Sequence, residues 1–162
     1  MKDQLIATFT SLLENASPED QWVIQYLLQG LEKKQQGEYT RYIDSTLHME
    51  RRFIDDTSII KMPITPVIHN FIGTPHGGIL ATISDAAMGE LATQSLPAGH
   101  NVVTTNMTVN YLQTTTAEQL IAKGRFVRKG KTLMVMESTV EDNTGKLLAT
   151  ASASFLVIQA RK

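Results

Sequence analysis

Apolar side chains recur every three or four residues through the first third of the chain. This spacing predicts an amphipathic helix that runs up to residue 15. Ser17 and Pro18 then supply a good N-cap and a favoured first helical residue, and the apolar pattern resumes at Trp22 and continues to Gly37. We expect two helices, or one helix broken at residues 15–18. These helices would pack on the rest of the protein and contribute no catalytic residues. The apolar positions of the first stretch are Leu5, Ile6, Phe9, Leu12 and Leu13.

At Tyr39 the pattern changes to one typical of strands. β-Branched and aromatic residues predict two strands, which are followed by a Gly/Pro-rich loop and a helical run. Alternation of apolar and polar residues then predicts four more strands separated by turns. This order predicts an α+β domain over residues 39–162, on which the helical segment 1–38 packs. The expected strands are 39–54, 57–65, 101–113, 118–128, 131–142 and 146–159, with the loop at 71–78 and the helix at 79–93.

The central helix has no charged face. Between residues 77 and 93 only Asp85 and Glu90 carry a formal charge. One face is apolar, from Leu80 to Leu91, and the opposite face consists of small residues around Asp85. Because a helix without a charged side is typically buried all round, we expect a second copy of the protein to cover it. Asp85 would then lie at a subunit interface.

The start of this helix is a candidate binding site. The first N–H groups of a helix have no acceptor within the helix, and Gly77 and Gly78 have no side chains to shield them. A carbonyl oxygen docked there would be polarised. Asp85 lies roughly 10 Å further along the axis, so it is too far to act at its own helix start. Two antiparallel copies of the helix would bring the partner's Asp85 close.

Composition narrows the function classes further. The 162 residues include no cysteine, which excludes disulfides, thiolate metal sites and a cysteine nucleophile. A net charge of −1 argues against nucleic acids and anionic membranes as partners. The uncharged stretches 62–84 and 91–117 contain prolines or many polar residues, so neither is expected to span a membrane. The N-terminus does not resemble a secretory signal, and we expect a cytoplasmic protein.

A run of residues before the central helix resembles a known signature. Asn70-Phe71-Ile72-Gly73-Thr74-Pro75-His76-Gly77-Gly78, followed by Asp85, is similar to the motif of hotdog-fold acyl-CoA thioesterases. The branch is that of the phenylacetyl-CoA and 4-hydroxybenzoyl-CoA thioesterases, and the resemblance covers roughly residues 39–158. It implies a hotdog fold, in which a six-stranded antiparallel sheet wraps a long central helix, with the helices of 1–38 as an extra segment. It also implies pairing into dimers that associate as tetramers.

The resemblance also implies roles for individual residues. The Gly77 N–H would polarise the thioester carbonyl, His76 would shape the turn, and Asn70 would orient the thioester or water. Asp85 of the facing subunit would be the nucleophile or the general base. The reaction would need no metal and no cofactor, since coenzyme A is part of the substrate. Some family members carry Thr or Ser one turn after the acid, where this chain has Gly89.

Other residues are candidates for substrate binding. Gly73 and Gly78 lie within the motif, His69 directly precedes it, and Arg125 and Arg128 are candidates for the phosphates of coenzyme A. Each has a purely structural alternative: a solvated hairpin tip for the arginines, tight backbone packing for the glycines, and an interface carboxylate for Asp85. Two other functions stay open, a hydroxyacyl dehydratase of the same fold and a non-catalytic acyl- or CoA-binding protein. The acyl group also stays open between aryl, medium-chain and naphthoyl.

Overall fold

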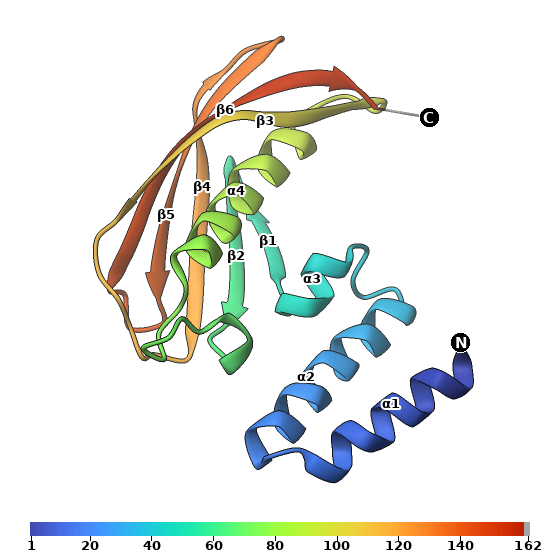
Figure 1. Ribbon diagram of the computed structural model, residues 1–162. Helices are drawn as coiled ribbons and strands as arrows, with labels where there is room; N and C mark the ends of the chain where they lie inside the picture. Colours follow the sequence, from blue (N-terminus) through green and yellow to red (C-terminus); the bar gives the residue numbers. More distant parts are fainter. Residues whose placement is uncertain (161–162) are drawn as a thin grey trace. The chain divides into compact units, whose positions relative to one another are not determined.

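The computed structural model describes residues 1–160 and divides the chain after His48 into two compact units. The first unit holds α1 (Lys2–Asn15), α2 (Pro18–Gln35) and α3 (Tyr42–Leu47) (Figure 1). Between α1 and α2, the Ser17 hydroxyl accepts a hydrogen bond from the backbone N–H of Asp20, and Asp20 accepts one from the backbone N–H of Ser17. This capping box starts α2 at the expected break, so the prediction of two helices is confirmed.

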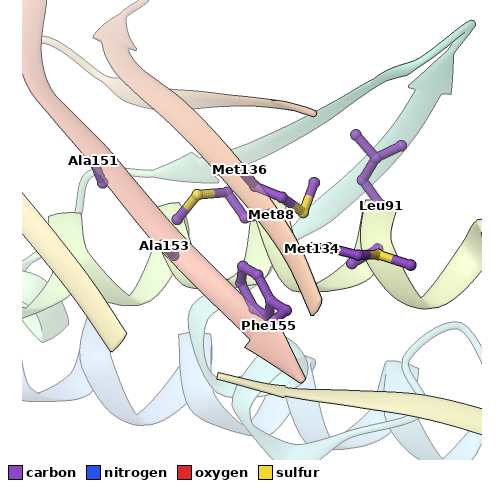
Figure 2. Close-up of a cluster of buried hydrophobic side chains, with 8 residues drawn as sticks. Met88, Leu91, Met134, Met136, Ala151, Ala153 and Phe155 are labelled. Carbon is purple, nitrogen blue, oxygen red and sulfur yellow. The ribbon is translucent and has the colours of Figure 1, made fainter. Parts of the chain in front are cut away.

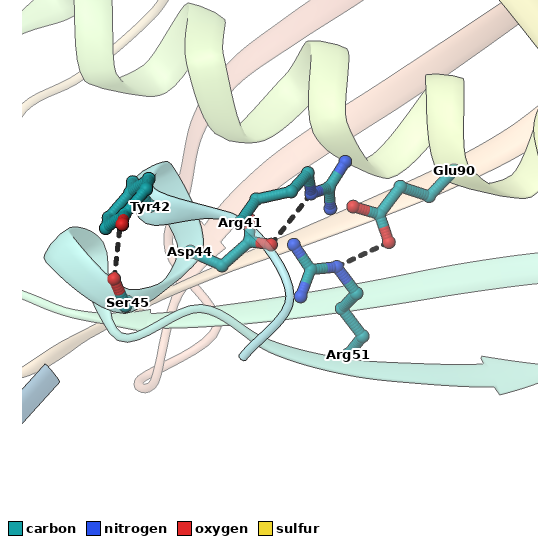
Figure 3. A network of polar contacts seen from close by, with 6 residues as sticks. All are labelled: Arg41, Tyr42, Asp44, Ser45, Arg51 and Glu90. Atoms are coloured by element: carbon teal, nitrogen blue, oxygen red, sulfur yellow. Dashed lines mark hydrogen bonds and ion pairs between the residues drawn. The ribbon is translucent and has the colours of Figure 1, made fainter. Parts of the chain in front are cut away.

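The expectation of a strand from Tyr39 is wrong in its first half, where the chain forms α3. The side chains of this segment bond at helical spacing: Arg41 pairs with Asp44 at 2.8 Å, and the Ser45 hydroxyl donates to the Tyr42 carbonyl (Figure 3). These local bonds outweigh the weak strand preference of its β-branched residues. His48 ends α3 in the left-handed conformation. The helical unit therefore extends ten residues beyond Glu38.

Packing between α2 and α3 requires a glycine. A Cβ at Gly30 would overlap the carbonyl of Ser45, so only glycine permits this approach. The His48 ring stacks on Tyr26 with centroids 4.0 Å apart, and His48 Nε2 lies 3.0 Å from the Tyr26 carbonyl. Burial lowers the pKa of His48, while that hydrogen bond raises it.

The second unit is built on one six-stranded antiparallel sheet, ordered β1-β2-β4-β5-β6-β3. The four C-terminal strands lie within two residues of their expected bounds, and β2 ends at Pro63, two residues before its expected end. The fold therefore agrees with the expected α+β architecture. The strands are β1 (Glu50–Ile54), β2 (Thr57–Pro63), β3 (His100–Tyr111), β4 (Gln119–Lys129), β5 (Leu133–Asp142) and β6 (Leu147–Gln159).

The long helix α4 (Gly77–Gln94) crosses the inner face of the curved sheet (Figure 1). Met88 and Leu91 of α4 pack with Met136 and Phe155 of the sheet in a buried cluster (Figure 2). Where α4 crosses β2 and β4, the Ser58 hydroxyl donates to the Ala87 carbonyl at 2.5 Å. No helix among residues 1–160 is long and apolar enough to cross a bilayer.

Candidate functional site

The loop before α4 is held together by Asn70. Its Oδ1 accepts hydrogen bonds from the backbone N–H groups of Ile72 and Thr74, at 3.0 and 3.2 Å, and its Nδ2 donates to the Thr74 hydroxyl at 3.1 Å. Gly73 has a φ of +75°, which favours glycine. Asn70 and Gly73 therefore build a rigid turn, and the N–H of His76 ties its far end to the Ile68 carbonyl at 2.9 Å.

His76 is the N-cap of α4. Its Nδ1 accepts a hydrogen bond from the Gly78 N–H at 2.9 Å, which requires an unprotonated Nδ1. The adjacent N–H of Gly77 has no acceptor among the described residues. The cap thus satisfies one backbone donor and leaves the next one open for a ligand.

This open donor faces a cavity of about 380 Å³ between the loop, α4 and the end of β3. The Tyr111 ring forms one wall and lies 3.4 Å from where a Cβ of Gly77 would be. None of the lining residues carries a formal charge. They are Asn70, Ile72, Thr74, Pro75, Gly77, Leu80, Tyr111, Leu112, Gln113, Thr114, Thr115 and Leu148.

Asp85 lies elsewhere on α4, eight residues and about 12 Å beyond Gly77 along the axis. It is half-buried, and the Thr104 hydroxyl of β3 donates to its Oδ1 at 2.8 Å. Thr104 is not among the residues predicted from the sequence. The register of β3 shifts between Thr104 and Asn106, and such bulges re-aim side chains, so no local sequence signal identifies this contact.

The other carboxylate of α4, Glu90, is an ion-pair partner. Arg51 of β1 lies 2.5 Å from it (Figure 3), and both side chains are mostly buried. This pair gives Glu90 a structural role on the helix. Of the two acidic residues of α4, Glu90 pairs with Arg51, whereas Asp85 has no basic partner among the described ion pairs.

A buried carboxylate anchors the loop that forms another wall of the cavity. Asp142 accepts hydrogen bonds from the hydroxyls of Thr115 and Thr144, both at 2.6 Å, and from the backbone N–H groups of Thr144 and Lys146. The Thr115 bond first, and then the Thr144 bond, lower the pKa of Asp142 to about 2, against burial, which raises it. Thr115 lines the cavity, so Asp142 supports its wall from behind.

The remaining candidates lie apart from this cavity. His69 is exposed, and Gly78 donates to the His76 cap. Arg125 pairs with Glu137 and lines a separate cavity of about 450 Å³, and Arg128 is exposed near the end of β4. The structure therefore joins Asn70 and Gly77 in one site, with Gly73 and His76 shaping it. Residues 1–160 include no group of three His, Asp or Glu arranged to hold a metal.

Comparisons with known proteins identify the family and the fold of the chain. A model of the thioesterase superfamily matches residues 72–149. The crystal structure of a Bacillus halodurans protein, determined with CoA, is 30% identical with a TM-score of 0.87, and covers 94% of this chain and 99% of that one. The 1,4-dihydroxy-2-naphthoyl-CoA hydrolase of Listeria monocytogenes is 25% identical over 65% of this chain and 85% of its own. A Haemophilus influenzae thioesterase shares the fold at 20% identity, with a TM-score of 0.71 over 74% of this chain and 85% of its own.

Proposed function

The chain belongs to the thioesterase superfamily of hotdog-fold proteins, and from this membership we propose that it hydrolyses an acyl-CoA thioester to a free acid and coenzyme A. The observation that carries the proposal is the Gly77 N–H, which lacks an acceptor and opens on an uncharged cavity at the start of α4. A hydrogen-bond donor fixed at a helix N-terminus stabilises the negative charge that develops on a carbonyl oxygen under attack.

The second requirement is a carboxylate beside that carbonyl, and we assign it to Asp85 of a second subunit. Asp85 is too far from Gly77 within one chain, so an antiparallel second copy of α4 must supply it. Two features favour such a pairing. β3 is a 12-residue edge strand that is mostly exposed, and an edge strand of this kind is a template for pairing with another chain. The α4 face around Asp85 consists of small, half-buried residues that permit close approach.

In this arrangement the hydrolysis needs few steps. The partner's Asp85 takes a proton from water, which attacks the carbonyl carbon, or attacks that carbon itself to form an acyl-enzyme anhydride. The carbonyl electron pair moves to oxygen, which the Gly77 N–H stabilises. The electron pair then returns to re-form the carbonyl as the C–S bond breaks, and the sulfur leaves as the CoA thiolate. With water as the nucleophile this releases the free acid directly; on the anhydride route, water then hydrolyses the anhydride, which releases the acid and restores Asp85. Thr104 holds the Asp85 carboxylate in one orientation.

The cavity walls indicate the class of acyl group. A cavity without charged side chains disfavours acyl groups that carry a second carboxylate or an amine, because that charge would be desolvated without a partner. The apolar side chains and the Tyr111 ring suit an uncharged aryl or short- to medium-chain group, in agreement with the naphthoyl-CoA substrate in the name of the Listeria relative. For the CoA phosphates we favour Arg128 over Arg125, because Glu137 already pairs with Arg125.

The open donor can be tested by one backbone substitution. Gly77→Pro removes the N–H at the first helical position, where proline is favoured, and His76 already has the extended conformation that precedes proline. Gly77→Ala is the matched control, because it keeps the N–H and its Cβ makes an ordinary contact with Tyr111. We expect release of CoA from a panel of uncharged acyl-CoAs to fall about 100-fold or more in Gly77→Pro and to change little in Gly77→Ala. Equal rates would refute the role of the donor.

Asp85 is tested by Asp85→Asn, with Glu90→Gln as the control on the same helix. We expect a loss of kcat of about 100-fold or more in Asp85→Asn only. Mixing Asp85→Asn with Gly77→Pro should restore part of the activity, because one of the two mixed sites would be intact. Rapid-quench mass spectrometry separates the two roles, since only a nucleophile adds the acyl mass to the protein. A wild-type protein that binds acyl-CoAs without releasing CoA would refute the enzyme function.

A further inference from the structure

Helix α1 carries an apolar stripe that the structure leaves uncovered. The stripe comprises Leu5, Ile6, Phe9, Leu12 and Leu13, which lie on one side of the helix. Their exposed fractions are 65, 54, 38, 54 and 42%, and α1 contains no buried residue. Isolated helices of about 12–15 residues are marginal in water, and α1 has 14. A stable α1 therefore requires a covering surface.

The size of the α1 stripe matches one side of a small protein interface. With roughly 190 Å² per large apolar residue, the exposed fractions amount to about 480 Å² on one copy. Two stripes packed on each other would bury about 1,000 Å², which is the size at which a specific interface becomes plausible. A half-exposed patch of this size is comparable to the largest apolar patch of a typical monomer, and such patches often bind a partner.

The charges near the stripe argue against a lipid surface. Residues 1–48 contain seven acidic and four basic side chains, a net charge of −3, and anionic lipid surfaces repel such a segment. An amphipathic helix that lies on a membrane instead carries Lys and Arg along its polar face. The one basic residue of α1 is Lys2, which helical geometry places at the N-terminal end of the stripe itself.

We propose that the α1 stripe packs antiparallel against the α1 stripe of a second copy of this chain. The stripe is centred on Phe9, so a two-fold axis at Phe9 places Leu5 opposite the partner's Leu13 and keeps apolar residues together along the whole contact. The same arrangement brings Lys2 towards the partner's Glu19 and Asp20, the acidic first turn of α2. A parallel pairing would instead place Lys2 beside Lys2. This interface is separate from the α4 and β3 pairing and does not depend on the proposed function.

The chain contains no cysteine, so single engineered cysteines test the pairing directly. A disulfide needs Cα atoms within about 7 Å, a distance that only positions near the two-fold axis reach with their own copy. We expect Phe9→Cys to form disulfide-linked dimers under mild oxidation, about tenfold more than Ser11→Cys on the opposite face of α1. Because α1 contains no buried residue, neither substitution should unfold the helical unit, and circular dichroism checks this.

The antiparallel direction has its own test. Leu5→Cys alone should not cross-link, because the two copies lie about 12 Å apart along the axes, whereas Leu5→Cys mixed with Leu13→Cys should form the mixed disulfide. A cross-link of Leu5→Cys to itself would overturn the antiparallel arrangement. Equal cross-linking of Phe9→Cys and Ser11→Cys would overturn the pairing, whether the stripe is then covered by the rest of its own chain or by another molecule. CoA release by the same variants, assayed separately, distinguishes this failure from failure of the proposed function.

Discussion

Asp142 is a buried carboxylate of the sheet unit that accepts four hydrogen bonds. Its pKa of about 2 lies below the usual 3.8 of an aspartate side chain, and a difference of this size corresponds to about 2 kcal/mol at neutral pH. Only 2% of Asp142 is exposed, so solvent screens its hydrogen bonds little. We expect Asp142→Asn to lower the free energy of unfolding by about 2 kcal/mol at pH 7, because a neutral amide is a weaker acceptor for the Thr115 and Thr144 hydroxyls.

The pH dependence follows from the direction of the shift. A carboxyl whose pKa is lower in the folded state stabilises the fold fully above its unfolded pKa, and that stabilisation is lost as the pH falls through the folded pKa. The difference between wild type and Asp142→Asn should therefore be constant above about pH 5 and decline towards pH 2. Thr115 lines the cavity, so we also expect a higher KM in the variant at pH 7.

Urea unfolding at fixed protein concentration measures the effect. Far-UV circular dichroism follows the secondary structure of both units, while fluorescence of Trp22, the only tryptophan, follows the helical unit alone. A shift of the first transition without a shift of the second therefore reports on the sheet unit. With a typical urea m-value, the midpoint should move by roughly 1 M. Asp56→Asn, at an exposed turn, is the matched control and should leave the midpoint unchanged. Equal midpoints of wild type and Asp142→Asn at pH 7 would show that the hydrogen bonds of Asp142 do not stabilise the fold. A difference that persists unchanged at pH 2 would show that the stabilisation does not depend on the ionised carboxylate.

Two further predictions concern α4 and its neighbours. Gly124→Ala should lower the free energy of unfolding by about 1–3 kcal/mol in a thermal or urea assay, because its Cβ would lie 2.8 Å from the carbonyl group of Ala87. Unchanged stability would mean that α4 can shift away from β4. Thr104→Val removes the hydroxyl that binds Asp85 and should lower kcat about tenfold with little change in KM. The control Thr105→Val removes a hydrogen bond to the Ser154 carbonyl and should leave kcat unchanged. A reversed pattern would place the assisting hydroxyl at Thr105.

Local features of the fold could be predicted because their interactions span only a few residues. The Ser17 N-cap of α2 joins residues only three positions apart, and the open start of α4 follows from the two glycines at that position. The alternation of β6 is also visible along the chain, and its alternate residues from Ala149 to Phe155 are buried as expected. α3 was missed because it is only six residues long, too short for an apolar period to distinguish it from a strand.

The sequence by itself predicted the strands from β2 to β6, the central helix and the open start of α4, since each depends on neighbouring residues. The turn that Asn70 builds was not predicted. Only the tertiary structure paired Thr104 with Asp85, 19 residues apart, and Thr115 with Asp142, 27 residues apart. It also gathered Tyr111 and Thr115 around Gly77. These contacts depend on the register of β3 and on how α4 lies across the sheet. Both are set by the packing of the whole unit, and a one-residue shift in register would turn each strand side chain to the other face.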